Sequence, residues 1–452
     1  MKTKKIITEL LVLFGLLQAS TQDIVQRASA QETVLSLSLK QSCELGVEKN
    51  VNVKNAVLEE QKADYQLKEV QSKLFPQISA YSDFSYFYAI PKTVLPGEIF
   101  GQTGMIAVET GTKYDWHSGF KATQLLYNQS YFTSLKVAKR LEAIAELSLQ
   151  QKKEEVIYQI SQVYYLILTT RNQIAQLNIS MQNTSRLLEI AGIQRENGVI
   201  RKVDYSRVIV NKSNLQTQID NLEQLYLQQL GFLKQIIGIE NIAEIELSDS
   251  LRFVPIPAPA ALPDLTNRIE IKLLDSQIEV ASLKRKLNRQ LYLPTLAAFG
   301  QYSFQGQRNE FDFFKGSDRF FKVGVIGLSL TIPIFDGLEK FAKIKQNDIE
   351  IQQFLNTRKE TSSQFAREFS NAERQYENSL NALRRQQESI EVAQEAYDIG
   401  LQGYQQQVVP LSDVLMSETS LTEARLSYFN ALNQLKNAEL EIRKAKGELL
   451  NF

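Results

Sequence analysis

The side chains that could do chemistry are few and widely spaced. His117 is the only histidine and Cys43 the only cysteine among 452 residues. A histidine-based triad, or a zinc site built from several nitrogen and sulfur ligands, therefore cannot be assembled. The chain also has no glycine-rich phosphate-binding loop of the Walker type. We therefore expect no enzyme activity, no cofactor and no bound metal.

Two carboxylates differ from the rest because each follows a turn and precedes a long helical pattern. They are Asp204 and Asp413. Most other acidic residues are spaced along helices so that they can pair with Lys or Arg four residues away. An aspartate at the start of a helix can be a plain N-cap. Position alone therefore gives these two residues either a structural or a functional role.

Long helices must carry these turns. Apolar residues alternate by three and four from Val156 to Ala191, and others lie seven apart in the second half of the chain. This spacing forms a seam that packs against another helix, and proline is absent from both stretches. We predict helices at about 128–197, 203–237, 338–402 and 411–446. A 70-residue helix is ~105 Å long.

Short alternating segments precede each long helix. They predict strand hairpins over 77–123 and 295–332, with loops at 89–112 and 307–319. Trp116 and Phe120 face one way, whereas His117 and Lys121 face the other. Each run is close to the ~10 residues of a tilted membrane strand, although a water-soluble hairpin would show the same alternation. Four strands cannot close a membrane barrel, because the smallest have about 8. Two or three copies would have to share one.

The two halves of the chain resemble each other. Leu74-Phe75-Pro76 recurs as Tyr292-Leu293-Pro294, and Val203-Asp204-Tyr205 recurs as Ser412-Asp413-Val414. We predict an internal two-fold repeat, with a first copy at 31–237 and a second at 268–452. Each would contain a helix, a strand hairpin and two long helices. A proline-rich crossover at 238–267 would join them and could hold a short strand.

The first thirty residues have the pattern of a signal peptide. A basic start, an apolar run over 6–17 and Ala28-Ser29-Ala30 fit export and cleavage, and the apolar run is too short to span a bilayer. Removing 1–30 leaves 47 basic and 49 acidic side chains, a net charge of −2. This near neutrality argues against nucleic acid as a partner.

The order of these motifs resembles the TolC-like outer-membrane efflux proteins over about residues 35–447. The matching residues are Leu74-Phe75-Pro76 and Tyr292-Leu293-Pro294, Pro333-Ile334-Phe335-Asp336-Gly337, and Asp413-Val414-Leu415. The resemblance implies a mainly α fold with a small β part. Coiled-coil-like helices would form a periplasmic α-barrel. Four strands per chain would contribute to a shared, 12-stranded transmembrane β-barrel of a homotrimer.

The resemblance implies a passive exit duct in the cell outer membrane, with a long periplasmic extension in contact with outer membrane lipid at one end. Such a duct serves a tripartite efflux pump or a type I secretion system. Its partners are a periplasmic adaptor (membrane fusion protein) and an inner-membrane transporter of RND, ABC or MFS type. The alternative is a periplasmic or surface coiled-coil structural or adaptor protein without a pore, which would not need two apolar-faced hairpins. The exported substrate stays open.

The resemblance also implies a gate formed by Asp204, Tyr404 and Asp413. Tyr404 would bond to Asp204 and hold the tunnel closed. Asp413 would line a constriction where three copies form an acidic ring that favours cations. The turns at the same end would contact the adaptor. These turn residues are Gly198, Val199, Ile200, Val408, Val409 and Pro410.

Three residues depart from the family pattern at this end. Gln407 replaces the usual glycine of the second turn. Val409 stands where some members have an arginine, and Met416 stands where some have an acidic residue. We therefore expect a gate held by fewer bonds and an acidic ring of weaker selectivity.

Overall fold

The computed structural model describes residues 35–239, 244–254, 264–315 and 320–450. The predicted signal peptide and the prolines of 255–263 lie outside this range. The described residues fall into two compact units. One takes the described residues of 35–57, 148–239, 244–254, 264–271 and 361–450, and the other is formed by 58–147, 272–315 and 320–360. Each unit therefore draws on both halves of the sequence, and the division into two repeats stays a prediction.

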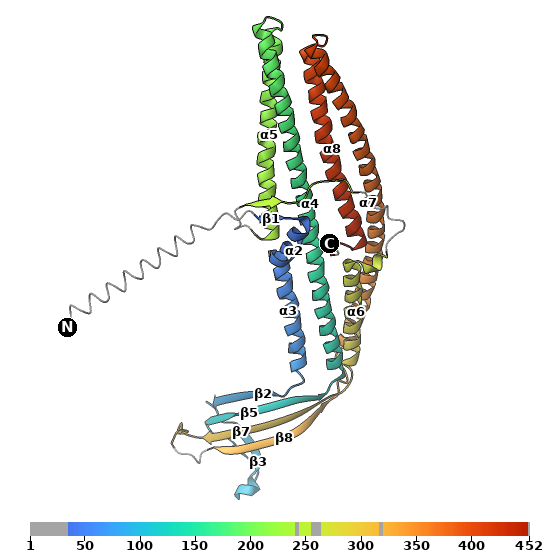
Figure 1. Ribbon diagram of the computed structural model, residues 1–452. Coiled ribbons are helices and arrows are strands. Elements are labelled where there is room, and N and C mark those ends of the chain that lie inside the picture. The colour runs from blue at the N-terminus through green and yellow to red at the C-terminus, as the bar shows by residue number, and fades with distance from the viewer. Residues whose placement is uncertain (1–34, 240–243, 255–263, 316–319, 451–452) are drawn as a thin grey trace, which may run out of the picture. The chain divides into compact units, whose positions relative to one another are not determined.

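One unit contains a four-stranded antiparallel sheet (Figure 1). Its strands are β2 (Gln77–Tyr86), β5 (Tyr114–Tyr127), β7 (Thr295–Arg308) and β8 (Phe321–Thr331), in the order β2-β5-β7-β8. The two predicted hairpins are thus joined edge to edge through β5 and β7. Gly119 lies at this junction, where an added Cβ would approach the Tyr302 carbonyl oxygen to 2.5 Å. The backbones can therefore approach this closely only because Gly119 lacks a side chain.

The two faces of the sheet differ in polarity, as the alternation predicts. Phe84 lies opposite Trp116 on one face, whereas Asp83 lies opposite His117 on the other. The His117 ring nitrogen Nε2 is 2.7 Å from Asp115 Oδ1 and 3.3 Å from Gln305 Nε2. On the apolar face, side chains such as Ile78 and Ile326 are largely exposed. One face is therefore mainly polar and the other mainly apolar, although Val323 and Val325 of β8 share the polar face.

The prediction of a plain loop at 89–112 is wrong in one respect. It contains a small hairpin of its own, with β3 (Lys92–Pro96) and β4 (Met105–Glu109) joined through the 3-10 turn η1 (Gly97–Phe100). Lys92 and Glu109 close its base with N···O at 3.6 Å. The proline and glycine residues of this segment indicate turns. They are also compatible with short edge strands, so the sequence did not predict β3 and β4.

The helices are α2 (Leu39–Lys49), α3 (Val51–Ser72), α4 (Gln129–Glu196), α5 (Lys202–Ile237), α6 (Ile269–Gln290), α7 (Glu339–Gln405) and α8 (Leu411–Lys446). The four long helices begin and end within three residues of the predicted bounds. The apolar seam of α4, including Ile160 and Ile167, is buried against Leu233 of α5 and Leu435 of α8. The heptad spacing therefore marks the core of this unit. Among the described residues, no helix contains an apolar stretch long enough to cross a membrane.

A two-stranded parallel sheet ties the start of the described chain to the crossover segment. It pairs β1 (Leu35–Leu37) with β6 (Ile245–Leu247), so the crossover does carry a short strand. The Tyr164 hydroxyl donates to Leu37 O at 3.0 Å and to Asp249 Oδ2 at 2.8 Å. Arg171 donates to Leu247 O and Asp249 O at 2.6 and 2.5 Å. These bonds anchor the sheet to α4.

Candidate functional site

The two turns that carry the predicted site have the same backbone structure. After α4, Gly198 N donates to Arg195 O at 3.0 Å and Val199 N to Gln194 O at 2.8 Å. After α7, Gln407 N donates to Tyr404 O at 3.0 Å and Val408 N to Gly403 O at 2.8 Å. This pair of bonds is the Schellman motif, which satisfies the last carbonyls of a helix. The two helical hairpins therefore end in matching turns.

The motif requires a left-handed residue, and the two turns meet this requirement differently. Gly198 has φ 71°, and Gln407 has φ 63°. Glycine adopts this conformation freely, whereas a residue with a Cβ does so at a cost of about 1 kcal/mol. The second turn, in which Gln407 stands in place of the usual glycine, is therefore strained but keeps the backbone geometry of a glycine turn.

Asp204 and Asp413 occupy equivalent places in the first turns of their helices. Each is the third helical residue, and the N-caps are Arg201 and Pro410, neither of which makes a side-chain capping bond. The interpretation of the two aspartates as plain N-caps is therefore wrong. A carboxylate in a first turn is still favoured by the positive end of the helix dipole.

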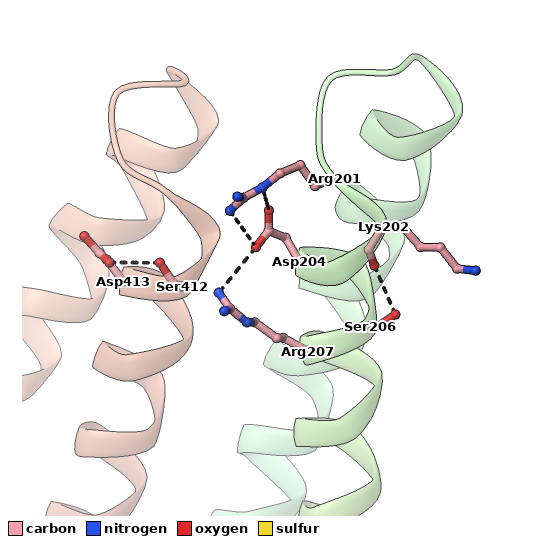
Figure 2. A network of polar contacts seen from close by, with 7 residues as sticks. All are labelled: Arg201, Lys202, Asp204, Ser206, Arg207, Ser412 and Asp413. Atoms are coloured by element: carbon pink, nitrogen blue, oxygen red, sulfur yellow. Dashed lines mark hydrogen bonds and ion pairs between the residues drawn. The ribbon is translucent and has the colours of Figure 1, made fainter.

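The surroundings of the two aspartates differ sharply (Figure 2). Asp204 Oδ2 accepts from Arg201 Nε at 2.9 Å, and Oδ1 lies 3.4 Å from an Arg207 nitrogen, with the carboxylate side chain only 16% exposed. Asp413 is exposed and accepts a hydrogen bond from the Ser412 hydroxyl at 3.1 Å. Two guanidinium groups thus compensate the charge of Asp204, whereas Asp413 presents its charge to solvent.

Tyr404 lies between the two turns and is 4% exposed. Its hydroxyl donates to the side-chain oxygen of Gln194 on α4. The direct Tyr404–Asp204 bond implied by the resemblance is absent from the contacts of the described residues. Burial first, and the negative charge of Asp204 second, raise the pKa of Tyr404. Both residues line a cavity of about 370 Å³ together with Gln407 and Pro410.

The predicted adaptor-contacting residues divide into two groups. Val199 and Val408 occupy equivalent positions just after the left-handed residue, and both are exposed. Ile200 and Val409 pack against the apolar cluster beneath the turns. A Cβ on Gly403 would come within 2.5 Å of Val409 Cγ2, so Gly403 makes room for Val409. The exposed pair is available to a partner, whereas the packed pair fixes the turns.

Two residues of this region, Gln194 and Glu418, were not predicted from the sequence. Glu418 is fully buried between α8 and α4, where Thr422 donates to it at 3.2 Å and also bonds to Ser180. Its Oε2 has no hydrogen-bond partner among the described residues. Burial raises the pKa of Glu418. Its position in the heptad seam, between Val414 and Leu421, indicates in the sequence that its side chain is buried. Elsewhere in the described chain, no group of three His, Cys, Asp or Glu side chains could hold a metal ion.

Comparisons with known proteins agree with this architecture. The family model described as outer membrane efflux protein matches residues 265–448. TolC of Salmonella enteritidis is 20% identical over 418 residues, covering 88% of this chain and 80% of TolC. TolC of Escherichia coli K12 is 21% identical over 427 residues, with the same coverage.

Solved structures of channels have the same fold. The structure of CusC has a TM-score of 0.74 at 15% identity, covering 93% of this chain and 94% of CusC. The Campylobacter jejuni CmeC outer membrane channel has a TM-score of 0.72 at 18% identity, covering 91% and 85%. The open state of the Neisseria gonorrhoeae MtrE channel has a TM-score of 0.73 at 15% identity, covering 90% and 88%.

The fold and these matches define an outer membrane channel protein rather than an enzyme. Residues 265–448 match the outer membrane efflux protein family, and the chain is similar to TolC over most of its length. It is accordingly a transport protein of the outer membrane with a periplasmic extension.

Proposed function

We propose that the protein is a passive, trimeric exit duct that carries cargo across the outer membrane. The observation that carries the proposal is the four-stranded sheet with one apolar and one polar face. Its outer strands, β2 and β8, have unpaired edges within the described chain. Strands placed in lipid need partners for every backbone group. Sheets of three copies, joined at these edges, would close around a polar interior.

The duct is gated at the helical turns. Tyr404 and Asp204 line the cavity between the two turns, and the hydrogen bond from Tyr404 to Gln194 links the two hairpins. Exposed Asp413 contributes one carboxylate per copy to an acidic ring at the constriction. Closely spaced carboxylates repel one another and favour cations. Opening therefore requires the two helical hairpins of each copy to separate at this end.

The exposed turns dock a periplasmic adaptor. Val199 and Val408 present apolar side chains on the two matching turns, and Gly198 and Pro410 shape the neighbouring backbone. Through the adaptor, the duct works with an inner-membrane transporter of RND, ABC or MFS type in efflux or type I secretion. The transporter supplies the energy, because the duct has no nucleotide-binding motif.

A coiled-coil spacer without a pore is the alternative, and the channel relatives do not favour it. Fractionation separates the two. A duct stays with the outer membrane through carbonate and salt washes, and the detergent-solubilised protein has the mass of three chains. Release by the washes, or the mass of a single chain, would contradict the proposed duct.

A further inference from the structure

The ends of α4 and α6 that adjoin the sheet carry an excess of positive charge. Residues 128–140, where α4 begins, hold three Lys and Arg and no Asp or Glu. Residues 281–294, where α6 ends, hold four Lys and Arg and no Asp or Glu. Farther from the sheet the sign reverses, since residues 141–150 and 269–280 together hold five Asp and Glu and one Lys. The positive charge is therefore confined to the helix ends that meet the strands in Figure 1.

The basic segments of α4 and α6 lie side by side. The Thr133 hydroxyl of α4 bonds to Gln290 Oε1 of α6 at 2.5 Å. Two turns farther along, Arg140 Nε donates to Glu279 Oε1 at 2.8 Å. The residue numbers rise on one helix as they fall on the other, so the helices run antiparallel. The two positively charged segments therefore lie at the same level, next to the sheet.

Both helices also have a neighbour on their other side. The Tyr131 hydroxyl of α4 donates to the Gln71 carbonyl oxygen of α3 at 3.4 Å. Arg285 of α6 pairs with Asp348 of α7 at 3.1 Å. The helices of this unit therefore form a layer in the order α3, α4, α6, α7. Because α4 and α6 are the inner helices of this layer, their exposed side chains point out of the layer rather than along it.

Cations from both inner helices border one groove. Lys136, Lys139 and Arg140 line a cavity of about 370 Å³ together with Leu283 of α6. Lys286 lies three residues after Leu283 and so shares its helix face. Lys136, Lys139 and Lys286 are exposed, and none of them forms an ion pair within the described part of the chain. These cations are therefore not compensated by their own chain.

Exposed apolar side chains lie between these cations and the sheet. On α4, Phe132 is 44% exposed and lies four residues before Lys136. Just after α6, Leu293 is 42% exposed and lies four and seven residues after Arg289 and Lys286. Residues at these spacings share one helix face. Each helix therefore presents, in order from the sheet, an apolar side chain and then exposed cations.

This order fits a membrane interface. Apolar and aromatic side chains contact the hydrocarbon edge, and Lys and Arg reach the headgroups. Lys286 lies four residues, or ~6 Å, from the end of α6, and Lys136 lies seven residues, or ~10.5 Å, from the start of α4. The headgroup layer of one leaflet is ~5–8 Å thick. Side chains lean toward the start of their helix, so Lys136 leans toward that layer. A face turned to a water-filled tunnel would not need exposed Phe132 and Leu293.

We propose that Lys136, Lys139, Lys286 and Arg289 bind the phosphate groups of anionic phospholipids in the periplasmic leaflet of the outer membrane. The inference rests on the proposed duct, whose sheet lies in the membrane and whose helices extend into the periplasm. The cations attract the negative headgroups, and the apolar side chains meet the acyl chains. The groove between α4 and α6 thus fixes the depth of the duct in the membrane. Salt weakens the attraction by screening the charges.

Lipid binding by the full-length protein tests this proposal directly. The protein is purified in a neutral detergent and titrated with phosphatidylglycerol or with zwitterionic phosphatidylcholine, and native mass spectrometry counts the bound lipids. We expect several-fold more phosphatidylglycerol to bind, and millimolar inorganic phosphate to leave it in place. Equal binding of the two lipids, or displacement by inorganic phosphate, would overturn the proposal.

Two lysines of α6 provide a matched pair of variants. Lys286 and Lys284 are both exposed, but residues two apart lie ~200° apart around a helix. We expect Lys286→Gln to lower phosphatidylglycerol binding several-fold, and added Lys136→Gln to lower it further. Lys284→Gln removes the same charge from another side of the helix and should leave binding unchanged. Equal losses in Lys286→Gln and Lys284→Gln would show that only net charge matters and would contradict the groove.

The assembly of the same protein separates this proposal from the proposed duct. Protein with the mass of three chains that resists the washes but shows no preference for phosphatidylglycerol contradicts the lipid site alone. Release by the washes, or the mass of a single chain, contradicts the duct. Binding to isolated peptidoglycan without a preference for phosphatidylglycerol would assign the cations to the cell wall and overturn the lipid site.

Discussion

The hydroxyl of Tyr404, in the last turn of α7, donates a hydrogen bond to the side chain of Gln194, in the last turn of α4. This bond links the ends of the two helical hairpins directly. Asp204 is nearby but is engaged by Arg201 and Arg207. In this chain the polar tie across the hairpins therefore uses an amide, and the aspartate acts through its charge.

Removing either partner of this tie should loosen the turns. We expect Tyr404→Phe and Gln194→Leu each to cost about 1 kcal/mol of local stability, and the double variant to cost little more, because both remove one hydrogen bond. Hydrogen exchange of the amides in 403–409 measures the effect. Tyr397→Phe is the control, since Tyr397 is also buried and lies one heptad away. Fully additive losses would contradict a shared bond.

The strained residue of the second turn gives a stabilising substitution. Gln407 has φ 63°, so Gln407→Gly should stabilise the turn by about 1 kcal/mol, because glycine adopts this conformation without a Cβ penalty. The mirror substitution, Gly198→Gln, should destabilise the first turn by a similar amount. Thermal unfolding of the detergent-solubilised protein compares them. A loss of stability in Gln407→Gly would show that the Gln407 side chain makes a favourable contact.

The buried Glu418 should make stability depend on pH. Burial raises its pKa in the folded chain, against the opposing effects of Ser180, Thr422 and Arg425. Between the ordinary glutamate pKa of about 4.3 and this raised value, the folded state holds more protons than the unfolded state. Stability from this group is therefore greatest below that window and falls as pH rises through it.

Glu418→Gln removes this titration. We expect the variant to be more stable than the parent at neutral pH and to lose the decline that begins above about pH 4. Thermal unfolding at a series of pH values measures both. Glu423→Gln, an exposed change on the same helix, is the control. Identical pH profiles for parent and Glu418→Gln would contradict a buried, proton-binding carboxyl.

The two aspartates should contribute unequally to ion selectivity. Asp413 is exposed, whereas two arginines compensate Asp204. We expect Asp413→Asn to reduce cation preference several-fold and Asp204→Asn to change it little, because only the first removes an uncompensated charge. Reversal potentials in a salt gradient measure the preference. A larger effect of Asp204→Asn would assign the constriction to the first turn.

The long helices could be predicted because their signal is repeated many times. Residues such as Ile160 and Ile167 fall on one seam, and every turn of the helix repeats the pattern. The sheet faces followed from alternation in the same way. The hairpin β3–β4 could not be read from its sequence, because its five-residue strands are too short for alternation to stand out against proline and glycine.

The site was predicted only in part, because its partners come from separate helices. The resemblance indicated Tyr404 and Asp204, and both line one cavity. Their partners, Gln194 and Arg207, depend on the rotation of α4 and α5 about their axes, which no local pattern encodes. Gln407 shows the reverse case, since the Schellman hydrogen bonds keep the turn in a conformation that its side chain disfavours.

Single-channel conductance of the purified protein in a planar bilayer tests the central claim, a gated duct, most directly. We predict a small, cation-preferring conductance for the parent. It should rise in Tyr404→Phe and in Gln194→Leu, and stay unchanged in the control Tyr397→Phe. Absence of conductance from the parent and both gate variants, with correctly assembled protein in the bilayer, would contradict the account.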